Sequence, residues 1–127
     1  MIDIKDNIKI TNLSPQLLVT SLDRSIQYYQ LLGFESGFRY EDFYAAITKD
    51  GYSIHLKLGQ PVKEERENRQ KNEDLDIVLA VGEIRELYNR VKDLPVNIIQ
   101  PLREMPYGLE FYLTDPDGYL LGFIEQN

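Results

Sequence analysis

Two hairpin segments with the same pattern constrain the fold of this chain more than any other feature. Residues 43–56 and 110–123 each contain two apolar-rich strands joined at an Asp-Gly pair, which is a strong signal for a tight hairpin turn. Counted from the Asp-Gly pair, His55 in the first hairpin corresponds to Gly122 in the second. The chain therefore contains two copies of one unit, and these two residues occupy equivalent positions in them.

The similarity extends towards the N-terminal side of each hairpin. A short apolar strand is followed in both copies by an amphipathic segment, over residues 22–32 and 84–94, whose apolar residues recur at helical spacing. Ser21 is a suitable N-cap for the first helix, and Gly33 is suited to follow its last turn. Each unit reads strand, helix, strand, strand, strand, so we predict one duplicated α+β domain over residues 1–127.

The remaining segments are predicted to lie around the two units, which span about residues 13–60 and 75–126. The segment 61–74 is rich in charge and predicts a solvated linker, although a binding role is the alternative. Residues 1–12 are expected to form a leader strand or an arm. Residues 101–107 contain two prolines and are predicted to form a loop between a strand at 96–100 and the last hairpin.

Composition excludes several classes of function. The chain has no cysteine, which excludes disulfides, thiol nucleophiles and thiolate metal sites. A formal net charge of −7 argues against a nucleic-acid partner. No apolar run is long enough to cross a bilayer and no apolar signal region opens the chain, so we expect a cytoplasmic protein that is not in a membrane. The acidic balance favours a cationic ligand, with solubility as the alternative explanation.

Strand alternation indicates which side chains face a cleft. Glu110 interrupts an apolar hairpin and must face water, a partner or a ligand. His55 alternates with polar residues and lies on the polar side of its strand. Aromatic residues in strands are commonly core residues, but alternation also makes several of them candidates for a cleft, namely Phe38, Tyr40, Tyr44, Tyr107 and Tyr112.

These features together resemble a known superfamily. The helix start at residues 21–25, the Leu-Gly-Phe sequence at 32–34 and the Asp-Pro-Asp-Gly turn at 115–118 are similar to those of the vicinal oxygen chelate superfamily. This superfamily includes glyoxalase I, extradiol dioxygenases and bleomycin-resistance proteins. The resemblance covers about residues 13–126 and implies two βαβββ repeats that form paired curved sheets around a cleft, with the helices outside. It also implies a homodimer, in which the repeats pair within one chain or between chains.

The resemblance raises the question of a metal. Four positions match the family's ligand positions, namely Ser14, His55, Asp76 and Gly122. A catalytic divalent site needs about three ligands from histidines and carboxylates, whereas Gly122 offers none and Ser14 is a poor ligand. His55 and Asp76 remain as metal candidates. The pattern is closest to the metal-free bleomycin-resistance branch, so we expect no cofactor, with a divalent metal as the alternative.

Three functional hypotheses follow. The first is metal-independent binding or sequestration of a small amphipathic or cationic molecule in a dimer cleft, as in antibiotic resistance; His55 and Asp76 would then contact the ligand, and no catalytic residue is assigned. The second is a metal-dependent lyase, isomerase or dioxygenase, which would need Glu110 or Glu125 as a third ligand. The third is a structural dimer with a vestigial cleft. For His55, a general base and a surface histidine with a satisfied hydrogen bond are further alternatives.

Overall fold

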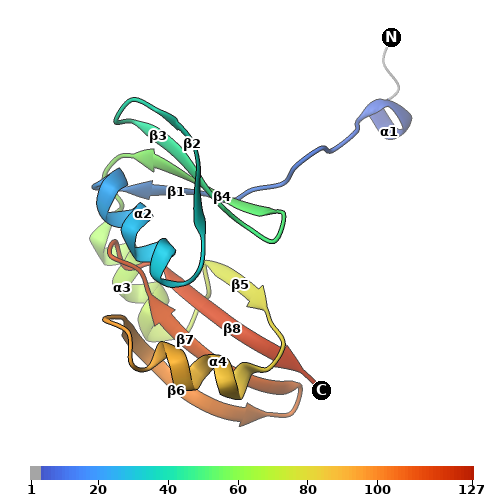
Figure 1. Cartoon of the computed structure of the whole chain (residues 1–127), viewed down its shortest axis with the longest axis vertical. Coiled ribbons are helices and arrows are strands. Elements are labelled where there is room, and N and C mark those ends of the chain that lie inside the picture. The colour runs from blue at the N-terminus through green and yellow to red at the C-terminus, as the bar shows by residue number, and fades with distance from the viewer. Residues whose placement is uncertain (1–3) are drawn as a thin grey trace.

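The computed structural model describes residues 4–127 and contains two βαβββ modules joined by a helix (Figure 1). Module 1 comprises β1 (Gln16–Val19), α2 (Leu22–Leu31), β2 (Glu35–Tyr40), β3 (Tyr44–Lys49) and β4 (Tyr52–Leu58). Module 2 comprises β5 (Ile77–Ala80), α4 (Ile84–Val91), β6 (Asn97–Met105), β7 (Gly108–Thr114) and β8 (Leu120–Gln126). The remaining helices are α1 (Ile4–Asn7) and the connecting α3 (Lys63–Asn72). The predicted duplicated α+β fold is confirmed.

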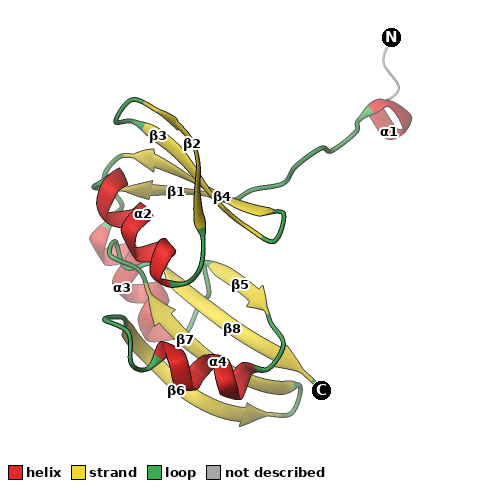
Figure 2. Ribbon diagram, in the orientation of Figure 1, coloured by secondary structure: helices red, strands yellow, loops and turns green. Residues whose placement is uncertain are grey.

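Each module forms a four-stranded sheet with the same strand order. Sheet A has the order β1-β4-β3-β2 and sheet B the order β5-β8-β7-β6, and in both sheets only the first pair is parallel. Helix α2 packs on one face of sheet A and α4 on one face of sheet B (Figure 2). We call the opposite faces the open face of sheet A and the open face of sheet B. The described part of the chain has no helix long and apolar enough to cross a membrane.

The local signals in the sequence act as expected. The Arg24 N–H donates to the Ser21 side chain at 3.2 Å and caps α2, and Gly33 follows the helix with φ of +91°. Asp50 and Gly51 both have positive φ, as a two-residue hairpin turn between β3 and β4 requires. Alternation in β1 buries Leu17 and Val19 towards α2 and leaves the residues between them on the open face of sheet A.

The two modules share one apolar core and are also fastened by polar side chains. The Tyr29 hydroxyl donates to the Asp115 carboxylate at 2.8 Å, and the Tyr28 hydroxyl donates to the Thr114 carbonyl at 3.0 Å. From module 2, the Tyr119 hydroxyl donates to the Leu18 carbonyl at 2.8 Å. The turn between β7 and β8 is therefore fixed to α2 and β1. Burial raises the pKa of Asp115 to about 6, despite the hydrogen bonds that the carboxylate accepts.

The connecting segments contain more regular structure than expected. The charged segment 61–74 joins the two units and most of its residues are exposed, but it forms α3, whose Arg66 is buried. Residues 101–107 are not a loop up to Tyr107, because β6 continues to Met105 and pairs with β7. Register shifts on both sides of Gln100 accommodate Pro101, which has no N–H to donate to a strand ladder.

The N-terminal segment is an arm, as predicted, although its first described turn is helical. It projects from the body of the molecule before β1 (Figure 1). Its apolar side chains Ile8, Ile10 and Leu13 are exposed. The part of the predicted arm at residues 1–3 lies outside the described residues.

Candidate functional site

Four predicted residues meet on the open face of sheet A. The Phe38 ring lies 5.4 Å from the ring of Tyr40, 6.0 Å from that of Tyr44 and 5.3 Å from that of His55, measured between centroids. Tyr44 and His55 are in edge-to-face contact at 5.5 Å. Phe38 is 39% exposed and Tyr40 is 59% exposed, so this cluster presents aromatic surface to solvent and is not part of the core. Strands β2, β3 and β4 each contribute to it.

A chain of hydrogen bonds runs through this cluster. The Gln16 side-chain amide donates to the Tyr44 hydroxyl at 3.0 Å, and the Tyr44 hydroxyl lies 2.7 Å from His55 Nδ1. Gln16 pairs with His55 across the parallel strands β1 and β4, which places both on the same face. Lys57 follows on that face two residues beyond His55 and is exposed. Gln16 and Lys57 belong to this site but were not among the predicted residues.

The second group of predicted residues lies on the open face of sheet B around Glu110, which is 0% exposed. Its carboxylate accepts hydrogen bonds from the Tyr107 hydroxyl, from the Tyr112 hydroxyl at 2.8 Å and from Arg103 Nε at 2.8 Å. Burial acts to raise the pKa of Glu110, but these hydrogen bonds and the Arg103 charge together lower it below its usual value. Glu110 is thus a carboxylate whose partners are already in place.

Arg103 is the residue of this network that the sequence did not indicate. It pairs with Glu110 across β6 and β7, and its guanidinium also contacts Glu73 at the end of α3 at 3.1 Å. The Tyr112 ring lies 5.3 Å from the guanidinium. Because residues 101–107 were predicted to be a loop, the position of Arg103 opposite Glu110 was missed. An alternating strand continued through Pro101 would have indicated it.

Asp76, predicted to face the cleft, is engaged by α3. Its carboxylate contacts Arg66 at 2.9 Å and Arg69 at 2.7 Å, and it accepts the Leu120 N–H at 2.8 Å. The Arg66 guanidinium also lies over the Tyr119 ring at 4.3 Å. The side chain of Asp76 is 10% exposed. Asp76 therefore holds α3 on module 2, and the two arginines of the charged segment are its partners.

Within one chain, the residues at the family's four ligand positions are not gathered around a common point. His55 is on sheet A with its Nδ1 facing Tyr44, whereas Asp76 is on sheet B between two arginines. Ser14 is hydrogen-bonded to Ser53. A side-chain carbon added at Gly122 would lie 2.5 Å from the Leu75 side chain, which occupies the space above it. Within residues 4–127 no group of three side chains is placed to hold a metal.

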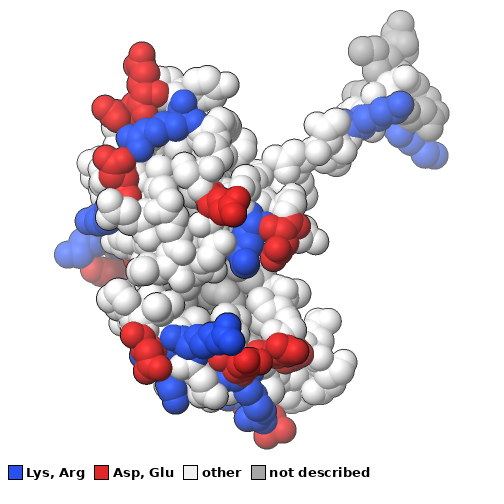
Figure 3. Space-filling view, viewed as in Figure 1, with Lys and Arg blue, Asp and Glu red and all other residues white. Residues whose placement is uncertain are grey.

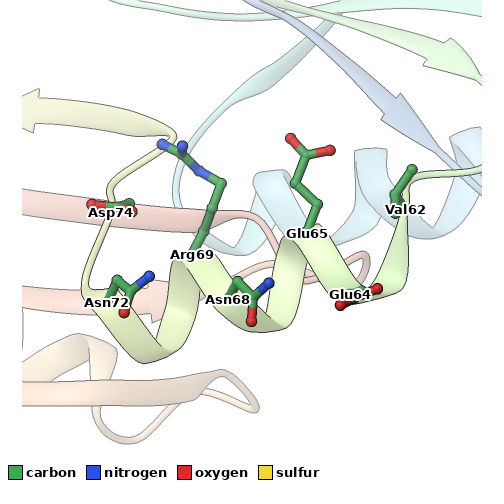
Figure 4. Close-up of a pocket in the computed structure, with 7 residues that line it drawn as sticks. All are labelled: Val62, Glu64, Glu65, Asn68, Arg69, Asn72 and Asp74. Carbon is green, nitrogen blue, oxygen red and sulfur yellow. The ribbon is translucent and has the colours of Figure 1, made fainter.

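Hollows also lie outside these faces, and two of them differ in the polarity of their lining. An apolar groove of about 470 Å³ runs between the modules, where the outline is notched in Figure 3, and its lining includes Pro15, Phe34, Ile54, Ile77, Leu79 and Phe123. A shallow polar hollow of about 330 Å³ follows α3 (Figure 4). In that view Glu65 and Arg69 point to one side of the helix, and Glu64, Asn68 and Asn72 lie along its other flank. The groove is the more apolar of the two and adjoins the base of the N-terminal arm.

The paired βαβββ modules and their two open faces define a class of fold, and comparison with known proteins identifies the family. The model of the "Glyoxalase/Bleomycin resistance protein/Dioxygenase superfamily" matches residues 10–123, so this chain belongs to that superfamily. A search of curated protein sequences finds no match.

Solved structures with the same fold cover nearly all of the chain. The crystal structure of UcmS2 superposes with a TM-score of 0.74 at 20% identity, covering 92% of this chain and 98% of that one. A glyoxalase-related enzyme from Clostridium phytofermentans gives 0.74 at 18% identity, with 96% and 99% covered. A bleomycin-binding protein complexed with bleomycin gives 0.65 at 18% identity, with 93% and 100% covered. At these identities the likeness establishes the fold.

Proposed function

We propose that this protein binds and sequesters a small amphipathic or cationic molecule without a metal. The observation that carries the proposal is the exposed aromatic cluster of Phe38, Tyr40 and Tyr44 beside His55. Flat aromatic surface with a few polar groups is typical of small-molecule sites, and aromatic faces also attract cations. The occupied positions at Asp76 and Gly122 support metal independence.

A neighbour in the family supports the kind of ligand. One solved structure with this fold is a bleomycin-binding protein in complex with bleomycin. Sequestration of a toxic compound requires a binding cleft and no bond-making group. Antibiotic resistance is therefore the use that we propose for such binding.

We propose further that the cleft is completed in a homodimer, in which the arm of a second copy lies in the groove between the modules. Ile8 and Ile10 alternate along the arm, and the groove that they would enter is apolar. The outer edge of β5 also has no strand partner in the described chain. We expect sedimentation equilibrium to give twice the monomer mass of 14.8 kDa, and replacement of both isoleucines by aspartate to shift the protein towards monomer. A wild-type monomer at high protein concentration would contradict the dimer.

The binding proposal predicts that only substitutions on the open face of sheet A weaken binding of the ligand. Bleomycin is expected to raise the midpoint of thermal unfolding in a concentration-dependent manner, because a ligand of the native state stabilises it. Tyr40→Ala should weaken binding about tenfold by removing exposed aromatic surface, since roughly 1.4 kcal/mol corresponds to that factor. Isothermal titration calorimetry measures the change.

Tyr52→Ala is the matched control, because Tyr52 is also an exposed tyrosine but lies away from the aromatic cluster. Since Tyr52 lines the groove proposed for the partner's arm, the control is compared at a concentration where sedimentation shows the same oligomeric state as wild type. It should leave binding unchanged. Loss of binding in Tyr52→Ala with retention in Tyr40→Ala would move the site to the groove. Addition of Mn²⁺, Ni²⁺, Zn²⁺ or Fe²⁺ to metal-stripped protein should not raise the midpoint of thermal unfolding. A rise that His55→Ala abolishes would instead favour a metal-dependent lyase, isomerase or dioxygenase.

A further inference from the structure

The direction of the hydrogen bonds around His55 determines what kind of ligand atom the aromatic cluster accepts. The Gln16 amide nitrogen donates to the Tyr44 oxygen at 3.0 Å. A phenol has one proton, and the nearest acceptor for the proton of the Tyr44 hydroxyl is its second neighbour, His55 Nδ1, at 2.7 Å if that nitrogen is unprotonated. In that arrangement His55 Nδ1 is an acceptor, and the proton of the neutral imidazole is carried by Nε2.

Nε2 is the part of His55 that a ligand can reach. Within residues 4–127 no side chain or backbone group forms a hydrogen bond with Nε2. Nε2 is also not one of the fully buried polar atoms without a partner, so it is accessible from outside. The Phe38 ring lies beside the imidazole, with the centroids 5.3 Å apart. A donor N–H next to an exposed aromatic surface would hold a flat molecule whose oxygen acceptor lies at the edge of its ring system.

Charge on the same face favours an anionic acceptor. Lys57 is exposed two residues beyond His55 on β4 and makes no ion pair with the described residues. The carboxylates of the opposite sheet are already paired, Asp76 with Arg66 and Glu110 with Arg103. The open face of sheet A thus offers two donors, His55 and Lys57, and Lys57 has no carboxylate partner among the described residues.

Resting on the proposed function, we infer that Gln16 and Tyr44 are positioning residues that fix His55 as an Nε2–H donor, and that the ligand is a flat aromatic molecule with a carboxylate on that donor. Of the two ligand classes proposed above, amphipathic and cationic, this inference selects an amphipathic molecule that carries a hydrogen-bond acceptor. The aromatic part would lie on Phe38 and Tyr40, and the carboxylate would meet His55 and Lys57. Because charge-assisted hydrogen bonds are the stronger ones, the carboxylate should dominate selectivity.

The tautomer can be measured directly, because His55 is the only histidine in the chain. A long-range proton–nitrogen correlation spectrum at alkaline pH should contain one pair of ring-nitrogen signals, with Nε2 protonated and Nδ1 unprotonated. Gln16→Glu replaces the amide donor with a carboxylate that accepts the Tyr44 proton. This reverses the hydrogen bonds and should move the imidazole proton to Nδ1. Protonated Nδ1 in the wild-type protein would overturn the inference.

Binding is tested with three probes of the same ring system, 1-naphthoate, naphthalene and 1-naphthylmethylammonium, by fluorescence titration. We expect 1-naphthoate to bind at least about tenfold more tightly than the other two. His55→Phe keeps a flat ring but removes the donor, so it should weaken 1-naphthoate about tenfold and leave naphthalene unchanged. Lys57→Gln should weaken only 1-naphthoate, by a smaller factor.

The outcomes separate this inference from the proposed function. Equal binding of the three probes, or tightest binding of 1-naphthylmethylammonium, overturns the inference and leaves small-molecule binding standing. Loss of naphthalene binding in His55→Phe would mean that the imidazole acts only as aromatic surface, which also overturns it. Binding of none of the probes, together with no response to bleomycin, overturns both.

Discussion

Replacing Arg103 with methionine is expected to lower the free energy of unfolding by about 2–4 kcal/mol, because it leaves the Glu110 carboxylate buried without its cation. Glu110 has no exposed surface, and Arg103 contacts it at 2.6 Å and 2.8 Å. The partial exposure of Arg103 keeps the expected loss below that of a fully buried pair. Chemical denaturation at neutral pH measures the change.

Two further variants show whether the loss comes from the stranded carboxylate. Glu73→Gln removes only the outer, exposed ion pair of Arg103 and should cost less than about 1 kcal/mol. The double variant Arg103→Met, Glu110→Met removes both charges and should recover most of the stability, since an apolar pair of similar volume can replace a buried ion pair. If Arg103→Met costs no more than Glu73→Gln, the network around Glu110 does not contribute in this way.

Lowering the pH from 7.5 to 5 is expected to raise the contribution of Asp115 to the free energy of unfolding by about 1.4 kcal/mol. Asp115 lies where the turn between β7 and β8 contacts α2. Burial raises the pKa of Asp115 from 3.8 to about 6 in the folded protein. The folded state therefore binds a proton that the unfolded state does not bind until lower pH. Unfolding becomes less favourable as pH falls through 6, and this contribution is lost as pH rises above it.

Asp115→Asn separates this effect from all other titrations. Asparagine keeps an oxygen for the N–H groups of Asp117 and Tyr119 but cannot ionise. We expect the difference in unfolding free energy between wild type and variant to change by about 1.4 kcal/mol between pH 7.5 and 5, with wild type gaining at the lower pH. Urea denaturation at both pH values provides the comparison. A difference that is independent of pH would show that Asp115 has the same pKa in the folded and unfolded states.

Local signals account for why so much of the fold was predictable. The Asp50-Gly51 turn, the Ser21 cap and the apolar stripes of the two helices each depend on residues close in sequence, and the duplicated pattern gave the module order. The two features that the sequence did not predict, helix α3 and the extension of β6, depend on distant partners. Helix α3 has no apolar stripe, and it is anchored by Arg66 and Arg69 to Asp76 in module 2.

The sequence predicted which candidate residues share one face of a strand pair, but it did not predict how the two groups of residues lie relative to each other. Alternation grouped Phe38, Tyr40 and Tyr44 correctly because neighbouring strands place their side chains on one face. It could not reveal that these residues and Glu110 lie on different sheets of the chain, since that depends on how the modules pack. Nor could it identify Arg103, whose partner Glu110 is fixed by the register of β6 on β7.

The contact between Leu75 and Gly122 has a consequence for which residues can be exchanged at these two positions. A glutamate at position 122 would need the space that the Leu75 side chain fills, and Asp76 beside it would have to release both arginines before it could share a metal. Gly122→Glu alone would therefore require the Leu75 side chain to shift and would leave Asp76 paired with its two arginines. Residues 75, 76 and 122 thus constrain one another, and the outcome of an exchange at one of them depends on the other two.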